Sequence, residues 1–318
     1  MINAEEIYKG ILSNRTLLMG VAIIMVIVYH SFCWIFNPIG IFNIGYIGVD
    51  IFLFLSGIGL RNSFENNKIS KFYFNRFIRI YPIYFVSVIL MYFVFTNDWS
   101  LRDLIHNLLT TGYYFNGGEN RFDWYLESLF TLYIFFPFFF LLRKSGFTSV
   151  LILLFAAAIC LHFFNISWWY DCLIGRLPIF MYGIVLKNHY HTIKWVSIIG
   201  LILYIPCYLL CSRFLAASFL TCPIIIAIIT LSGKVYGMRQ GIKWINTLGK
   251  YTLEIYIANL FVFQIIERHC SELGIIQRFG VYFISEIIIA LVIIYLNILI
   301  RDNIIIKRKQ PDITYNRN

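Results

Sequence analysis

Ten apolar runs constrain this chain more than any other feature of its sequence. A helix needs about 20 predominantly apolar residues to cross the roughly 30 Å of hydrocarbon in a bilayer. The runs are too long and too continuously apolar for the strands of a membrane barrel, which alternate over about ten residues. The sequence therefore predicts an all-α polytopic membrane protein with about ten transmembrane helices. The predicted spans are residues 17–36, 44–60, 80–95, 124–142, 149–165, 172–186, 195–212, 215–232, 251–266 and 279–300.

The composition leaves little of the chain outside the membrane. Of the 318 residues, 60% are hydrophobic and 13% are charged, whereas about a quarter of the residues in ordinary soluble proteins are charged. Ten crossings use about 200 residues, which excludes a sizeable soluble domain. We therefore expect residues 1–318 to form a single transmembrane domain, and any chemistry to take place inside the helical bundle.

The positive charges are distributed unequally between the two sides of the predicted spans. With the N-terminus placed inside, 20 of the 26 Lys and Arg residues fall on the inner side and 6 on the outer side. Cytoplasmic segments of membrane proteins carry the excess of Lys and Arg, so both termini are predicted to be cytoplasmic. The net charge of +10 then reflects topology, and the expected partner is the lipid bilayer and not a nucleic acid.

Six ionisable side chains fall inside the apolar runs. A charged group within the hydrocarbon costs at least a few kcal/mol, so such residues are candidates for function. The six are His30, Asp50, Glu127, Arg176, Glu254 and Glu286.

His30 and Asp50 are predicted to share one depth in the outer half of the membrane. His30 lies about 20 Å along the first run, at a helical rise of about 1.5 Å per residue, and Asp50 lies near the outer start of the second run. A short loop joins the runs, so the side chains are expected to meet, with Asp50 orienting His30 as a general base. The alternative is a structural His30 bonded to a backbone carbonyl and an Asp50 solvated among the headgroups.

Small residues surround Asp50 in the second run. Gly45, Gly57 and Gly59 allow helices to approach closely, and Ser56 can form a hydrogen bond across a helix interface. Packing explains these residues but leaves Asp50 unexplained.

Basic residues recur at helical spacing just before the third run. Lys68, Lys71, Arg76 and Arg79 form a stripe with an aromatic opposite face. On one interpretation the stripe sets the topology and contacts anionic lipid headgroups. On the other, Arg76 and Arg79 bind a cytoplasmic polyphosphate with their forked guanidinium groups.

The seven cysteines do not indicate a metal site. They lie mostly within the predicted spans and show no CxxC pair or other metal-ligand spacing. We expect them to act as small apolar packing residues.

Three segments in order are similar to the acyltransferase-3 family of integral-membrane O-acyltransferases, which modify exported or cell-surface polysaccharides in bacteria. The first segment ends in His30, the second contains Asp50 and Ser56, and the third contains Arg76 and Arg79. Three later segments also resemble the family, so the resemblance spans nearly the whole chain. The six segments are residues 20–30, 48–57, 74–82, 124–137, 175–183 and 248–256.

The resemblance implies a multi-pass enzyme of the bacterial plasma membrane. It implies that the donor is acyl-CoA, with acetyl-CoA as the expected form, on the cytoplasmic side. It also implies that no cofactor is permanently bound and that the acceptor is a hydroxyl of an extracytoplasmic polysaccharide or glycolipid. His30 would be the general base and Asp50 its orienting partner. Arg76, Arg79 and Arg15 would hold the CoA. The substrate channel would be lined by Ser56, Trp124, Glu127 and Arg176.

The chain departs from the family pattern at two positions. Met19 stands where the family usually has Arg, and Arg15, one helical turn earlier, is the candidate substitute. Asn259 stands where the ninth helix often carries a His. These departures keep a catalytically degenerate partner protein open as an alternative. A transporter or flippase for a glycan or lipid intermediate is the other alternative, which would show discontinuous helices and paired intramembrane charges.

Overall fold

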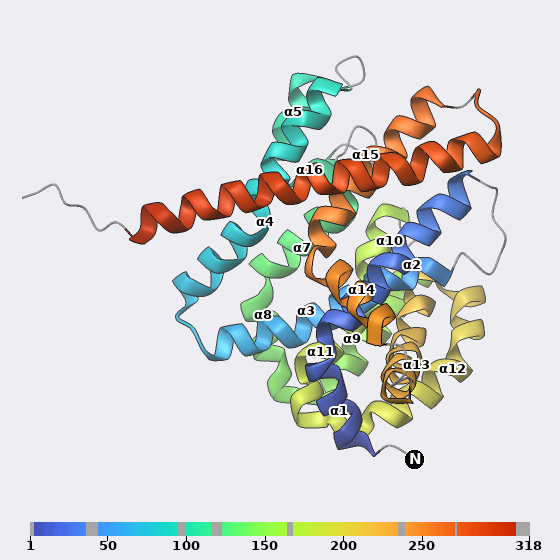
Figure 1. The fold of residues 1–318 in the computed structure, drawn as a ribbon. Coiled ribbons are helices and arrows are strands. Elements are labelled where there is room, and N and C mark those ends of the chain that lie inside the picture. Colours follow the sequence, from blue (N-terminus) through green and yellow to red (C-terminus); the bar gives the residue numbers. More distant parts are fainter. Residues whose placement is uncertain are drawn as a thin grey trace, which may run out of the picture.

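The computed structural model describes residues 3–35, 44–94, 99–115, 123–163, 168–234, 239–270 and 272–309. Nearly all of these residues are helical, and no strand occurs among them. The predicted all-α fold is therefore confirmed (Figure 1). The helices are α1 (Ala4–Ser13), α2 (Arg15–Ile35), α3 (Ile47–Glu65), α4 (Ile69–Val94), α5 (Leu101–Leu108), α6 (Gly112–Phe115), α7 (Trp124–Ile134), α8 (Phe136–Leu142), α9 (Phe147–Phe163), α10 (Trp168–Ile174), α11 (Leu177–His189), α12 (Ile193–Leu210), α13 (Arg213–Lys234), α14 (Arg239–Lys250), α15 (Thr252–His269) and α16 (Ile275–Lys309).

Each predicted span overlaps a helix or a pair of helices, and the described residues contain five helices long and apolar enough to cross a membrane. Up to seven qualify if each of two bent pairs counts as one span. The protein is thus a multi-pass membrane protein, while the number ten and the cytoplasmic termini stay predictions. The last residues of spans 17–36, 80–95 and 149–165 lie outside the described residues.

Helix α3 forms the centre of the bundle. It contacts α2, α4, α11 and α13, and 83% of its most apolar 18-residue stretch is buried inside the protein. Glycines permit the closest of these contacts, because a methyl group at Gly57 would overlap the Phe180 carbonyl oxygen and one at Gly183 would overlap that of Phe54. The predicted packing role of Gly57 is therefore what the structure shows.

Two pairs of consecutive helices meet at sharp bends, and the second bend interrupts the predicted span 124–142. Helices α1 and α2 meet at 76°, and α7 and α8 meet at 61°. The second bend follows from Pro137 in the first turn of α8, since proline lacks the N–H that would continue α7. The first bend separates α1 from Arg15, which begins α2.

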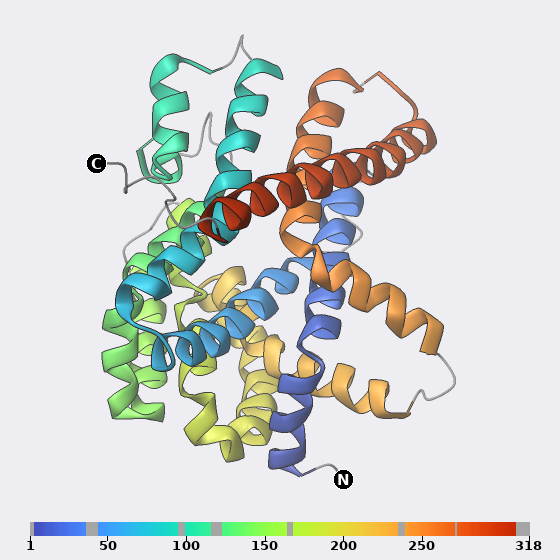
Figure 2. The ribbon, with the colours of Figure 1, turned by 60° about the vertical axis from the view of Figure 1, so that its left-hand side comes forward.

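Helices α15 and α16 close one side of the bundle. Figures 1 and 2 show α16 as a long helix running across the bundle beside α15. Helix α15 also contacts α2 and α4, so it joins α16 to the N-terminal helices. The polar side chains between α2, α15 and α16 belong to the candidate site.

Candidate functional site

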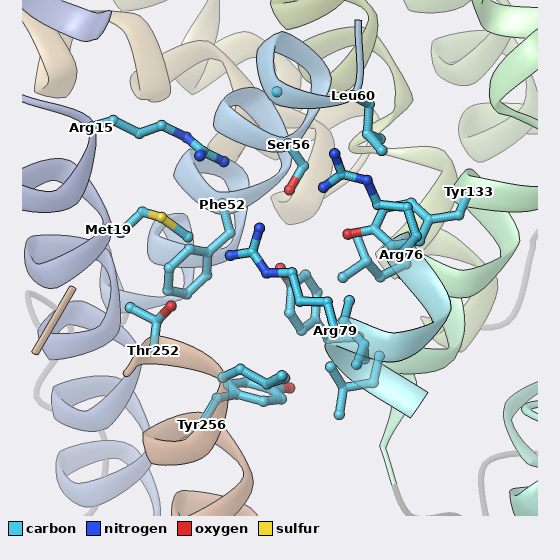
Figure 3. A pocket seen from close by; sticks show the side chains of 16 residues that line it. Arg15, Met19, Phe52, Ser56, Leu60, Arg76, Arg79, Tyr133, Thr252 and Tyr256 are labelled. Atoms are coloured by element: carbon cyan, nitrogen blue, oxygen red, sulfur yellow. The ribbon is translucent and has the colours of Figure 1, made fainter. Parts of the chain in front are cut away.

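A cavity of about 70 Å³ lies between five helices, and three arginines line it. This volume is enough for several water molecules. Figure 3 shows the guanidinium groups of Arg15, Arg76 and Arg79 pointing into one space, with the Ser56 hydroxyl among them. Four predicted site residues are thus brought together. The lining also includes residues that the sequence did not single out for this cavity, namely Met19, Phe52, Tyr125, Tyr133, Thr252 and Tyr256.

The local structure explains why the arginines converge. Arg76 and Arg79 are separated by one helical turn of α4, so both side chains project from the same face. Arg15 reaches them from the start of α2, passing over Gly59 of α3, where an added methyl group would lie 3.1 Å from Nη2 of Arg15. Glycine at position 59 therefore leaves room for the guanidinium group.

None of these three arginines has an ion-pair partner among the described acidic side chains. The Nε atoms of Arg15 and Arg76 are buried and form no hydrogen bond within the described part of the chain. By contrast, Arg61, Arg143 and Lys187 all lie within 3.8 Å of Glu65. Neighbouring cations without a counterion repel one another, so the cavity is suited to an anion.

His30 occupies a second polar site further along α2. Its Nδ1 is hydrogen-bonded to Oδ1 of Asn259, and the rings of Tyr29 and Phe263 lie 5.5 and 5.9 Å away. The Nδ2 of Asn259 donates to the Tyr282 hydroxyl and, at 3.4 Å, to Glu286. The sequence singled out Asn259 as a departure from the family but did not identify it as the partner of His30.

The predicted contact between Asp50 and His30 is wrong. Asp50 forms a fully buried ion pair with Arg176, with 3.3 Å between Oδ2 and Nε. The register of α2 and α3 explains the error, since Gly48 packs on Ala22 and Gly45 packs on Met25. Asp50 therefore lies beside the part of α2 near Ala22, eight residues or about 12 Å along the axis from His30.

Arg176 is buried within the protein and does not line the cavity. Its Nη1 donates to the Cys172 carbonyl at 3.0 Å, and its guanidinium carbon lies 5.0 Å from the Trp124 ring and 4.7 Å from the Phe214 ring. Trp124 thus packs against Arg176. These contacts join α7, α10, α11 and α13 to α3, which makes the Asp50–Arg176 pair part of the framework of the bundle.

Glu127 belongs to another buried polar cluster. Its carboxylate accepts a hydrogen bond from the Tyr113 backbone at 2.6 Å and from the Tyr84 hydroxyl at 3.5 Å. These bonds connect α7 to α6 and α4. Because these hydrogen bonds hold helices together, they do not support the predicted channel role of Glu127. No group of three possible metal ligands occurs among the residues searched, which are the described ones.

The family model for an acyltransferase domain matches residues 16–301. The chain belongs to the acyltransferase-3 family. The match contains every candidate site residue except Arg15, which precedes it by one position. No curated protein and no solved structure matches the chain.

Two helices connect the two polar sites of this membrane acyltransferase. Arg15 and His30 are fifteen residues apart on α2, or about 22 Å at the helical rise. On α15, Thr252 and Tyr256 line the arginine cavity, and Asn259 contacts His30 one turn beyond Tyr256. An elongated ligand lying along α2 and α15 would therefore pass from the arginines towards His30.

Proposed function

We propose that this acyltransferase moves an acyl group, most simply acetyl, from acyl-CoA to a hydroxyl of an extracytoplasmic glycan. The observation that carries the proposal is the cavity lined by three arginines that have no acidic partner among the residues that the structure describes. A CoA thioester supplies both the phosphates that such a cavity favours and the acyl group that the family transfers.

The donor binds with its phosphates at Arg15, Arg76 and Arg79. Arginine suits this role because its planar fork donates two hydrogen bonds to one phosphate and stays charged. Ser56, which lines the same cavity, adds a hydroxyl donor. The pantetheine arm extends along α2, and its length is comparable to the rise of about 22 Å between Arg15 and His30. No permanently bound cofactor is required.

The two substrates approach from opposite sides of the membrane. The excess of Lys and Arg in the segments that include Arg76 and Arg79 favours a cytoplasmic position for the cavity. His30, at the far end of α2, then lies in the outer half, where a polysaccharide or glycolipid hydroxyl can reach it. Together with the membership of the acyltransferase-3 family, this orientation supports a position in the bacterial plasma membrane.

His30 acts as the general base. As the acceptor oxygen attacks the thioester carbonyl carbon, the ring nitrogen Nε2 takes the hydroxyl proton. The tetrahedral intermediate then collapses with cleavage of the carbon–sulfur bond. The imidazolium returns its proton to the departing thiolate, so the products are the glycan ester and CoA thiol. Neither an oxidant nor a covalent acyl-enzyme is needed.

The test is acyl transfer by the purified protein in detergent, with acetyl-CoA as donor and a surface glycan as acceptor. His30→Ala should lower the rate of CoA thiol release and glycan acetylation by about 10²- to 10⁴-fold, the usual contribution of a general base. The matched control is His162→Ala, since His162 is exposed and bonds only the Leu210 carbonyl among described residues. Full activity of His30→Ala protein would remove His30 from the catalytic role.

A further inference from the structure

A buried chain of hydrogen bonds leads away from His30. It passes from Nδ1 of His30 to the amide of Asn259, and from that amide to Tyr282 and Glu286 of α16. Asn259 and Tyr282 are fully buried, and Glu286 is 6% exposed. The chain joins three helices at the residue that the mechanism uses as a base.

The partners of Asn259 determine how its amide is oriented. The NH₂ group of the amide donates to the Tyr282 hydroxyl and to Oε2 of Glu286, and the amide oxygen faces Nδ1 of His30. An amide turned the other way would no longer donate to the carboxyl group of Glu286. Glu286 and Tyr282 therefore present the Asn259 oxygen to the histidine ring.

This orientation selects one tautomer of His30. Because the Asn259 oxygen can only accept, Nδ1 must carry the proton, and the neutral ring then has its lone pair on Nε2. Among the residues that the structure describes, Nε2 forms no hydrogen bond. Nε2 therefore has a lone pair available to take a proton, as a general base requires.

We propose that Asn259, held by Glu286 and Tyr282, is a positioning residue that keeps His30 in the Nδ1-protonated tautomer with Nε2 directed to the acceptor hydroxyl. The inference rests on the proposed function, because it assigns a purpose to the tautomer only if His30 is the base. In this enzyme, a neutral amide performs the orienting role that the sequence had assigned to Asp50.

The first experiment removes the amide. Asn259→Leu keeps a similar volume but offers Nδ1 no acceptor, so kcat should fall by at least about 10-fold, a part of the roughly 10²- to 10⁴-fold that a general base contributes. The KM for acetyl-CoA should change less than about two-fold, because the arginine cavity is untouched. A structural defect would instead lower the amount of folded protein or change both constants.

The second experiment restores the bond with reversed polarity. Asn259→Asp alone removes the NH₂ donor to Glu286 and places a second acidic group beside it, so this variant should also lower kcat. Combining it with Glu286→Gln supplies an amide donor at position 286 and an acceptor at position 259, so kcat should return to within about five-fold of the wild type. Rescue by the double variant is not expected from a residue that only fills space.

The matched control is Asn297→Leu. Asn297 is also a buried asparagine at the α15–α16 interface, and it donates to the carboxylate of Glu254. It lies eleven residues along α16 from Glu286, about 16 Å away by helical rise. Its replacement should leave kcat within about two-fold of the wild type.

The outcomes separate this inference from the proposed function. If His30→Ala abolishes transfer but Asn259→Leu behaves like Asn297→Leu, the positioning role is overturned and the proposed function stands. Failure of the double variant to regain kcat, with normal folding, also overturns it. If His30→Ala remains active, the proposed function itself fails first.

Discussion

Two arrangements of arginine in this acyltransferase differ in their partners. Arg176 is fully buried, paired with Asp50 and enclosed by two aromatic rings. Arg15, Arg76 and Arg79 face a cavity and have no acidic partner within the described residues. A buried cation with a counterion stabilises one packing of the helices, whereas a group of cations without one is suited to binding an anion. The first arrangement therefore belongs to the framework, and the second belongs to the site.

The largest expected effect comes from breaking the buried pair. Asp50→Leu leaves Arg176 charged and without a counterion in the core, which should lower the free energy of unfolding by about 3–5 kcal/mol. The midpoint of thermal unfolding in detergent measures this loss. Replacing both residues, Asp50→Leu with Arg176→Met, should recover most of the stability.

The double variant also tests whether Asp50 takes part in the chemistry. If the pair is framework alone, the stable double variant should retain acyl transfer. A stable but inactive double variant would return Asp50 to the catalytic site. Equal instability of the single and double variants would contradict the role of the ion pair.

The next effect comes from the cavity arginines. Arg76→Ala with Arg79→Ala removes two guanidinium groups that bind phosphate, and hydrogen bonds to charged groups contribute about 1.5–3 kcal/mol. Because two such contacts are lost, the KM for acetyl-CoA should rise by at least about 100-fold, with no loss of stability. The exposed Arg102 supplies the control, since Arg102→Ala should leave KM unchanged. An unchanged KM in the double variant would mean that these arginines set the membrane topology and do not bind CoA.

A smaller effect is expected at Arg15, because one of three cations is removed. Arg15→Ala should raise the KM for acetyl-CoA by about 10-fold on the same scale. Met19 lines the same cavity and occupies the position where the family usually has Arg. Adding Met19→Arg should therefore restore the KM. If it does not, Arg15 is not the substitute for the family arginine.

The smallest effect is expected at Ser56. Its hydroxyl is a neutral donor on the cavity wall, and such hydrogen bonds contribute about 0.5–1.5 kcal/mol. Ser56→Ala should raise the KM for acetyl-CoA by about 2- to 10-fold and leave kcat unchanged. A large fall in kcat would mean that Ser56 acts nearer to the thioester than the arginine cavity.

The sequence predicts features that depend on neighbouring residues along the chain. The spacing of Arg76 and Arg79 places both on one face of a helix, and the structure shows both at the cavity. The run 124–142 was predicted as one continuous span, but it bends by 61° between α7 and α8. The local pattern of hydrophobicity does not change at that bend, and Pro137 alone indicates it.

By itself, the sequence determined the helical class, the membrane setting, the family segments and the basic stripe, because hydrophobicity, charge and helical spacing are local properties. The tertiary structure decided the partners. Asp50 pairs with Arg176, and His30 pairs with Asn259, 229 residues away in the chain. Both pairings depend on the register and crossing of packed helices, which glycine contacts such as Gly48 on Ala22 determine. Asp50 lies about two helical turns along α2 from His30, and this offset prevents the predicted His30–Asp50 contact.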